Sequence, residues 1–165
     1  TVGANDAYAF SLETNGNVAI KMASDGNVTK PLSAAFMALA NAENNQTGNG
    51  TVYTMLWAKS DVIDQGSDFA SGTFTAPVTG TYFFGVNMMM NSCAGLSYGD
   101  WKLVTSNRTY SRSTGVYIDG SNEVFAEYAD MDASDTAYVT IAIGGLGGDT
   151  ADIGVDSNFF GWLVT

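Results

Sequence analysis

Histidine is absent from this sequence of 165 residues, and cysteine occurs only once, as Cys93. Without histidine, neither a serine–histidine nor a cysteine–histidine nucleophile can form. A zinc site would also lack its usual ligands. A single cysteine cannot form an intrachain disulfide, so the sequence carries no mark of an oxidising compartment. We therefore expect Cys93 to be a small buried residue and the protein not to be an enzyme.

Charged residues are scarce as well, at 14% of the chain, and 6 basic residues stand against 17 acidic ones, for a net charge of -11. Phosphate backbones and anionic lipid surfaces both bind through lysine and arginine. No apolar run approaches the roughly 20 residues of a membrane-spanning helix. The sequence therefore predicts no nucleic-acid partner and no membrane insertion. A surface this poor in charge is expected to be partly buried against copies of the same chain.

Strand signals dominate what is present. Short runs rich in Val, Ile, Thr, Tyr and Phe are separated by turns that draw on 19 glycines. Turn signals recur about every ten residues, which is typical of a β-sandwich or barrel. In a main domain of residues 32–165, we expect strands at 34–42, 51–58, 72–76, 80–90, 101–105, 115–118, 123–128, 136–144 and 158–164.

Two of these expected strands show which side chains face the core. In the strand expected at 80–90, Tyr82 and Phe84 share one face and Phe83 lies on the other. In 136–144, alternate residues put an apolar face with Val139 and Ile141 toward the core, and the opposite face carries no charge either. Burial in a trimer would cover such second faces.

Residues 1–31 form a separate N-terminal section with three expected short strands. The pairs Asn15-Gly16 and Asp25-Gly26 are strong signals for tight turns, and Pro31 ends the section. Three short strands cannot build a core alone. This section is therefore expected to pack on a neighbour, for which identical chains around a three-fold axis are the natural choice. The chain starts at Thr1 without an initiator methionine, as expected for a piece of something longer.

The stretch FASGTFTAPVTGTYFFGVNMMM resembles the central signature of the complement C1q globular head, a branch of the tumour-necrosis-factor-like jelly rolls. The opening of the main domain, SAAFMALANA, is similar to the first strand of that family, and its ending, SNFFGWLV, is similar to the last strand. The stretch SDTAYVTI is similar to the family's penultimate strand. Residues 91–130 show no such match. The residues that match the signatures are Phe36, Phe69, Gly72, Phe74, Pro77, Gly80, Tyr82, Phe83, Phe84, Phe159, Phe160, Gly161 and Leu163.

This resemblance implies an all-β jelly-roll sandwich in a homotrimer, whose subunits pack through aromatic faces near the axis. The residues expected in the core or the trimer interface are Phe36, Phe74, Tyr82, Phe83, Phe84, Phe159, Phe160 and Trp162.

A second resemblance covers NVAIKMASDGNVTKPLSAAFMA, which is similar to the stalk-to-head junction of phage tail fibres and related virion proteins. It implies a location in a virion, with other virion proteins and a host surface glycan or protein as partners. The alternatives are a secreted C1q-like recognition or signalling ligand and a purely architectural trimerisation module.

One stretch, 98–117, concentrates basic and aromatic residues. Aromatic faces stack on sugars and arginine clamps carboxylates, so this stretch is the first candidate for a receptor glycan. The alternative is an exposed hairpin whose arginines pair with acids across the trimer. The candidate ligand-binding residues are Tyr98, Trp101, Lys102, Arg108, Tyr110 and Arg112.

Acidic residues gather in EYADMDASD, where Glu127, Asp130, Asp132 and Asp135 could supply oxygens to Ca²⁺. A solvated turn between two strands is the favoured interpretation of that stretch, and GGDTADIGVDSN is likewise expected to be a flexible glycine-rich loop. No other cofactor is expected. Paired carboxylates with tryptophans in a groove could also serve a glycosidase, which we consider the weaker reading.

Overall fold

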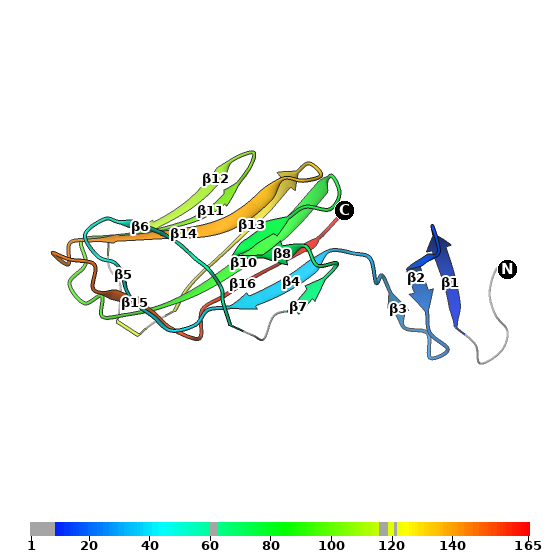
Figure 1. The fold of residues 1–165 in the computed structure, drawn as a ribbon, viewed down its shortest axis with the longest axis horizontal. Coiled ribbons are helices and arrows are strands. Elements are labelled where there is room, and N and C mark those ends of the chain that lie inside the picture. Colours follow the sequence, from blue (N-terminus) through cyan, green and yellow to red (C-terminus); the bar gives the residue numbers. More distant parts are fainter. Residues whose placement is uncertain (1–8, 60–62, 116–118, 121) are drawn as a thin grey trace.

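The computed structural model describes residues 9–59, 63–115, 119–120 and 122–165. Every regular element in these residues is a β-strand, which confirms the all-β prediction. Figure 1 shows two parts, a small N-terminal sheet at one end and a long sandwich of two sheets. In the part of the chain that the structure describes, there is no helix long and apolar enough to cross a membrane.

The N-terminal sheet consists of β1 (Phe10–Thr14), β2 (Asn17–Met22) and β3 (Val28–Thr29), paired in that order. The first turn places Asn15 at φ 49° and Gly16 at φ 75°, which is the pair of left-handed residues that a tight hairpin turn requires. The three predicted strands are present, with a turn at both places. The second turn differs from the prediction: the backbone nitrogen of Gly26 donates to the carbonyl of Ala23 at 2.9 Å, and only Gly26 of the Asp25-Gly26 pair has a positive φ, of 88°. Figure 1 shows this sheet beyond the end of the sandwich.

One layer of the sandwich is a seven-stranded antiparallel sheet in the order β5-β15-β10-β16-β4-β7, with β13 paired to the other edge of β10. Its strands are β4 (Ala35–Leu39), β5 (Glu43–Thr47), β7 (Ile63–Gln65), β10 (Gly80–Asn91), β13 (Asn122–Met131), β15 (Ala151–Ile153) and β16 (Asn158–Leu163).

The other layer is a six-stranded antiparallel sheet in the order β12-β11-β14-β9-β8, with β6 also paired to β14. Its strands are β6 (Val52–Thr54), β8 (Phe69–Ala70), β9 (Thr73–Thr75), β11 (Tyr98–Thr105), β12 (Thr109–Thr114) and β14 (Thr136–Gly144).

An aromatic cluster fills the core between the layers. Phe36 lies at its centre, with ring centroids 4.7 Å from Phe69, 5.0 Å from Phe74 and 4.9 Å from Phe159. The apolar face of β14 closes the other side, and Val139 is fully buried there, as the alternation predicts. Tight aromatic packing of this kind makes the sandwich a single folding unit.

The predicted strands differ from the structure mainly at the sheet edges. The sequence did not predict strands β5, β7, β8, β12 and β15. These strands are short or polar, and each is held extended by pairing with a neighbouring strand. The glycine-rich stretch that was expected to be a flexible loop contains β15. The predicted strand 115–118 lies mostly outside the described residues.

Candidate functional site

The residues predicted to bind a glycan do not form one site. Trp101 is only 2% exposed and lies in the core, so the prediction that it stacks on a ligand is wrong. The cause is the alternation of β11, which turns Trp101 and Leu103 inward and Lys102 outward. Tyr98 lies at one end of β11, whereas Arg108 lies beyond its other end, at the turn into β12.

The three basic residues of this stretch are all paired with acids of the same chain. Lys102 Nζ lies 2.7 Å from an oxygen of Asp100 on its own strand. Arg108 lies 2.8 Å from Asp130, and Arg112 lies 2.7 Å from Glu127. The alternative prediction was that these arginines pair with acids across a trimer. Instead, Arg108, just before β12, and Arg112, within it, both pair with acids of β13 in the same chain.

These two arginine pairs close an open edge of the sandwich. Strands β12 and β13 belong to different sheets and are not hydrogen-bonded to each other. Tyr110 is half-buried between them, and this burial raises the pKa of its hydroxyl, an effect that the nearby Arg108 partly offsets. A pocket of about 240 Å³ lies along the same edge, with Trp101 and Phe125 at its base and Arg112 on its rim. The edge is thus held by ion pairs and apolar contact together.

We expect the Arg112–Glu127 pair to contribute little to stability. The arginine side chain is 59% exposed, and ion pairs in solvent are worth about 0–1 kcal/mol. A double-mutant cycle with Arg112→Ala and Glu127→Ala, followed by urea unfolding, should give a coupling free energy below about 1 kcal/mol. A coupling of about 3 kcal/mol would mean that the pair is shielded from water, as in an interface with another chain.

The acidic turn does not assemble a calcium site. Asp135 accepts hydrogen bonds from the backbone nitrogen of Asp132 at 2.8 Å and from the Asn107 side chain at 2.9 Å. Asp130 is paired with Arg108, so its charge is already neutralised. Among the described residues, no three acidic, histidine or cysteine side chains converge as metal ligands. The prediction that Asp130, Asp132 and Asp135 ligate Ca²⁺ does not fit this geometry, and the solvated turn does.

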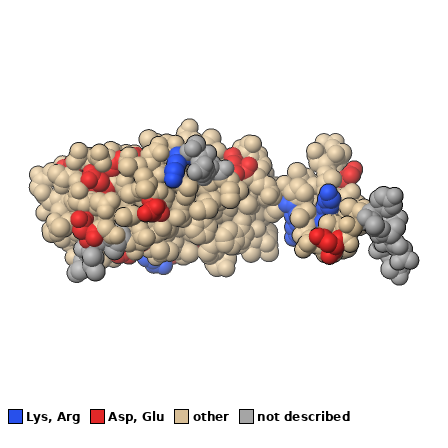
Figure 2. Space-filling view, turned by 90° about the horizontal axis from the view of Figure 1, so that it is seen from below, with Lys and Arg blue, Asp and Glu red and all other residues tan. Residues whose placement is uncertain are grey.

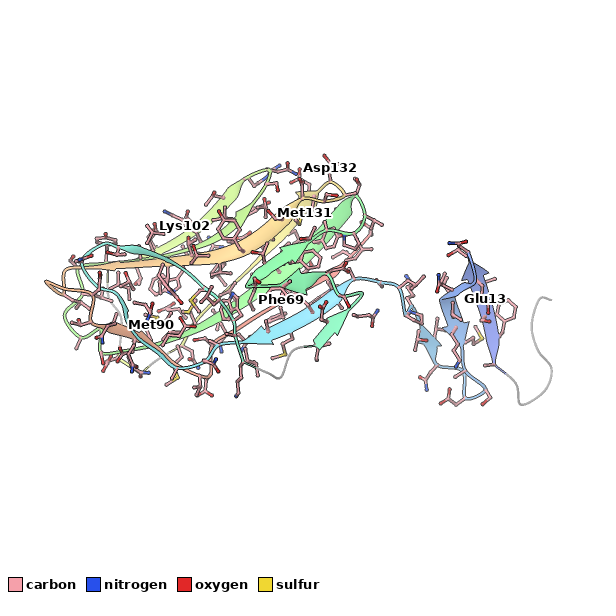
Figure 3. All side chains as sticks on the ribbon, viewed as in Figure 1. Glu13, Phe69, Met90, Lys102, Met131 and Asp132 are labelled. Atoms are coloured by element: carbon pink, nitrogen blue, oxygen red, sulfur yellow. The ribbon has the colours of Figure 1, made fainter. Side chains whose placement is uncertain are left out.

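Figure 3 shows Lys102 and Asp132, one residue from each predicted site, at separate places on the sandwich. Asp132 follows β13, at the end of the sandwich nearer the N-terminal sheet. The basic and the acidic residues of the two predicted sites meet where Arg108 pairs with Asp130.

Three loops meet at the opposite end of the sandwich, and we call residues 48–51, 92–97 and 144–150 the distal loops. Backbone hydrogen bonds join them to one another: Leu146 donates to the carbonyl of Gly48 at 3.0 Å, and Ser97 donates to the carbonyl of Gly144 at 2.8 Å. In Figure 1 this end, marked by β5 and β15, is the one farther from the N-terminal sheet.

Two aspartates that sequence analysis had placed in a flexible loop organise this end. Asp149 accepts hydrogen bonds from the backbone nitrogen of Asn49 at 3.2 Å and from Thr51 Oγ1 at 3.0 Å. Asp152 accepts from the backbone nitrogen of Asn45 at 2.9 Å and from Ser92 Oγ at 2.7 Å. No local sequence signal marks them, because their partners are 60 to 107 residues away in the chain.

Tyr98 is the one predicted ligand-binding aromatic that lies at this end and faces solvent, with 44% of its surface exposed. Its ring lies directly over Gly144, where a Cβ atom would be 2.2 Å from the ring. The absence of a side chain at Gly144 therefore makes room for the tyrosine ring at the end of the sheet.

Cys93 lies in one of the distal loops and is fully buried, as predicted. Its Sγ lies 3.4 Å from Asp119 Oδ1. Burial, and then this carboxylate, raise the pKa of the thiol to about 12. Since the thiolate is the reactive form, the native thiol is expected to be inert.

We therefore expect the native protein to resist alkylation by iodoacetamide at about pH 8, and to react fully once unfolded in guanidinium chloride. Intact mass measured over time would follow this reaction. Rapid labelling of the native protein would contradict the buried position of Cys93.

The outer surface of the seven-stranded sheet carries uncharged and aromatic side chains. We call it the outer face. Strand register places its side chains in three rows across the sheet, because directly paired residues point the same way. The rows are Tyr128, Phe83, Trp162, Ala35 and Gln65; then Ala126, Gly85, Phe160, Met37 and Ile63; then Val124, Asn87, Asn158 and Leu39.

Aromatic rings form the centre of the outer face. Phe83 lies 4.5 Å from the Trp162 ring and 5.2 Å from the Tyr128 ring, measured between centroids. The Phe160 ring covers Gly85, where any Cβ atom would come within 2.2 Å of it. Even so, Tyr128 remains 63% exposed and Trp162 44% exposed. The predicted opposition of Phe83 to Tyr82 and Phe84 is confirmed.

None of the side chains in these three rows is charged. Among the described residues, Asp130 borders this surface beside Thr81, and it is paired with Arg108. Ile63 and Val124, at the two sides, are 63% and 69% exposed. An uncharged apolar surface of this kind usually marks an interaction site.

The eight aromatics predicted for the core or the interface thus divide into two groups. Those between the layers are Phe36, Phe74, Tyr82, Phe84 and Phe159, which are buried within one chain. Those on the outer face are Phe83, Phe160 and Trp162.

Comparison with known proteins places the fold. No family model and no curated protein matches this chain. Among solved structures, the globular domain of zebrafish complement 1qA protein is similar, with a TM-score of 0.50 and 21% identity, over 80% of this chain and 98% of that one. Murine APRIL is similar with a TM-score of 0.54 and 10% identity, over the same shares of the two chains. At these identities the likeness shows the fold, a jelly-roll sandwich of the C1q and tumour-necrosis-factor type.

Proposed function

We propose that this chain, having the jelly-roll sandwich found in complement and tumour-necrosis-factor-like heads, forms a homotrimer through its outer face and acts as a recognition head without enzymatic activity. The observation that carries the proposal is the outer face itself: three rows of uncharged side chains with an exposed aromatic centre. Figure 2 shows charged side chains thinly scattered over the face of the sandwich that it presents.

Burial of this face would favour association. Exposed tryptophan, tyrosine and isoleucine side chains lose contact with water at low entropic cost, and aromatic residues dominate the energy of many interfaces. Identical faces around a three-fold axis need no complementary charges. Association of this type also accounts for a charged fraction of only 14%.

The distal loops are the surface proposed for recognition. They lie at the end away from the N-terminal sheet, and an assembly through the outer face leaves them in solvent. Tyr98 offers a stacking surface there, and hydrogen bonds to Asp149 and Asp152 hold the surrounding loops in place. Three such sites on one head would act together, so weak contacts could add up to firm attachment.

The setting that we propose is a virion appendage that contacts a host surface, and a glycan is the ligand class. This rests on the similarity of residues 17–38 to stalk-to-head junctions of virion proteins, and on a separate small sheet that precedes the head. A purely architectural trimer is the second candidate. It is favoured by the internal pairing of Lys102, Arg108 and Arg112, which leaves these cations engaged.

Mass in solution tests the assembly. Light scattering should give three times the 17.3 kDa of one chain, with or without a chelator, because the acidic turn is not built to bind metal. A monomer would contradict the trimer, and dissociation by the chelator would show a structural metal.

A glycan array tests recognition. The labelled wild-type protein should bind a subset of glycans, and Tyr98→Ala should lower that signal by about tenfold or more, since one aromatic stacking contact per site is lost. Lys102→Ala, on the side of the sandwich, is the matched control and should bind as the wild type does. No binding by a stable trimer would favour the architectural module.

A further inference from the structure

The N-terminal sheet has two faces of opposite character. In the register of β1, β2 and β3, Phe10, Met22 and Val28 lie side by side, and Leu12 lies beside Ile20 in the next row. All five side chains are apolar and share one face, which we call the N-terminal apolar face. Such a two-faced sheet is made to pack against something.

The opposite face is polar. Ser11, Lys21 and Thr29 lie side by side on it. Glu13 is on the same side, since Ser11 Oγ donates to its carboxylate at 3.3 Å. The polar face therefore suits water, and the apolar face does not.

The N-terminal apolar face has little cover within the described chain. Leu12 is 52% exposed, Met22 47%, Val28 55% and Ile20 36%. Among the strands that the structure describes, β1, β2 and β3 pair only with one another. Three short strands with no buried side lack the core that a stable sheet needs.

The segment that joins this sheet to the head is fixed to the sheet that carries the outer face. The side chain of Gln65, in β7, donates to the carbonyl of Lys30 at 3.0 Å and to that of Ser33 at 2.5 Å. Gln65 itself belongs to the first row of the outer face. The N-terminal sheet of each chain is therefore tethered close to the proposed interface.

We propose that the N-terminal apolar face packs against the same face of two other copies, so that the three small sheets fold together as a clasp at the base of the trimer. This rests on the proposed trimer. The occupant is a copy of this chain because the head would hold three such faces at the same height, beside one axis, at high effective concentration. The apolar face carries no charge that would oppose its own copy, while Lys21 and Glu13 remain in solvent on the outside.

Cross-linking of neighbouring positions tests the clasp directly. Met22→Cys and Lys21→Cys place a thiol on opposite faces of the same strand, and the native Cys93 is buried and unreactive. A short bis-maleimide added to the full chain should join Met22→Cys subunits into covalent dimers and trimers, at a yield at least several times that of Lys21→Cys. Equal yields, or a higher yield from Lys21→Cys, would overturn the proposal.

Hydrogen exchange supplies a second measurement that needs no new thiol. In the wild type, amides of β1 and β2 should be protected, and Leu12→Thr with Ile20→Thr should speed their exchange by about tenfold or more while β14 exchanges as before. The matched control is Ser11→Thr with Lys21→Thr, on the polar face, which should leave protection unchanged. Equal protection in both double variants would contradict the clasp.

The two proposals fail in different ways. A trimer whose β1 and β2 amides exchange at unfolded rates contradicts the clasp and leaves the head trimer intact. A monomer whose β1 and β2 amides are protected overturns both.

Discussion

Trp162→Glu is expected to convert the trimer into a folded monomer. The indole lies at the centre of the outer face, 4.5 Å from Phe83, and is 44% exposed in the single chain. In a trimer, three glutamates would be buried near one axis without partners, and a buried unpaired charge costs several kcal/mol. Light scattering should report the mass of one chain, and circular dichroism should report an intact β-sandwich.

The matched control for this substitution is Tyr98→Glu. Tyr98 is also an aromatic residue with 44% exposure, but it lies at the distal end. The Tyr98→Glu protein should therefore remain trimeric. A trimer of Trp162→Glu that persists at micromolar concentration would show that the outer face is not the interface, whereas monomers from both variants would show that assembly involves the distal end.

Phe36→Ala is expected to lower the free energy of unfolding by about 3–5 kcal/mol, the usual cost of removing a buried phenylalanine ring. Phe36 is 3% exposed and touches the rings of Phe69, Phe74 and Phe159 from both layers. Its loss leaves a cavity at the centre of the sandwich. That is a large fraction of the stability of an ordinary domain.

The measurement should be made in the Trp162→Glu monomer, because the stability of an oligomer depends on protein concentration. In that background, Tyr128→Ala is the control, since Tyr128 is 63% exposed. It should cost less than about 1 kcal/mol by urea unfolding. A similar loss for both variants would mean that the cluster around Phe36 is not the main core.

The fold followed from the sequence where hydrophobic pattern and turn chemistry agree. Strand β14 was predicted with its bounds, and β10 and β16 were predicted within one residue at each end. All three are paired on both sides in the centre of a sheet, so their sequences must suit burial. The edge strand β5, with the sequence ENNQT, has no such pattern, because only its partner β15 makes it extended.

The candidate site followed much less well. The concentration of basic and aromatic residues between 98 and 117 predicts a binding surface, yet alternate residues of β11, among them Trp101 and Leu103, face the core. No pattern in that stretch could predict the acidic partners of Arg108 and Arg112, because both partners come from β13. Contacts across the open edge of a sandwich depend on how the two layers lie together, which a local sequence does not record.

The absence of charge on the outer face would limit the size of the assembly. Each chain carries a net charge of -11, and the acids lie elsewhere than on the three uncharged rows. In the proposed trimer, closing these faces against one another would concentrate negative charge on the outside of the particle, threefold over. Further chains or other particles would then meet electrostatic repulsion, and the aromatic outer face would no longer be open to them. The uncharged outer face would thus limit assembly to the trimer, and the charge outside it would keep trimers apart in solution. Added salt should weaken the repulsion between trimers at concentrations that leave the apolar contact between subunits intact.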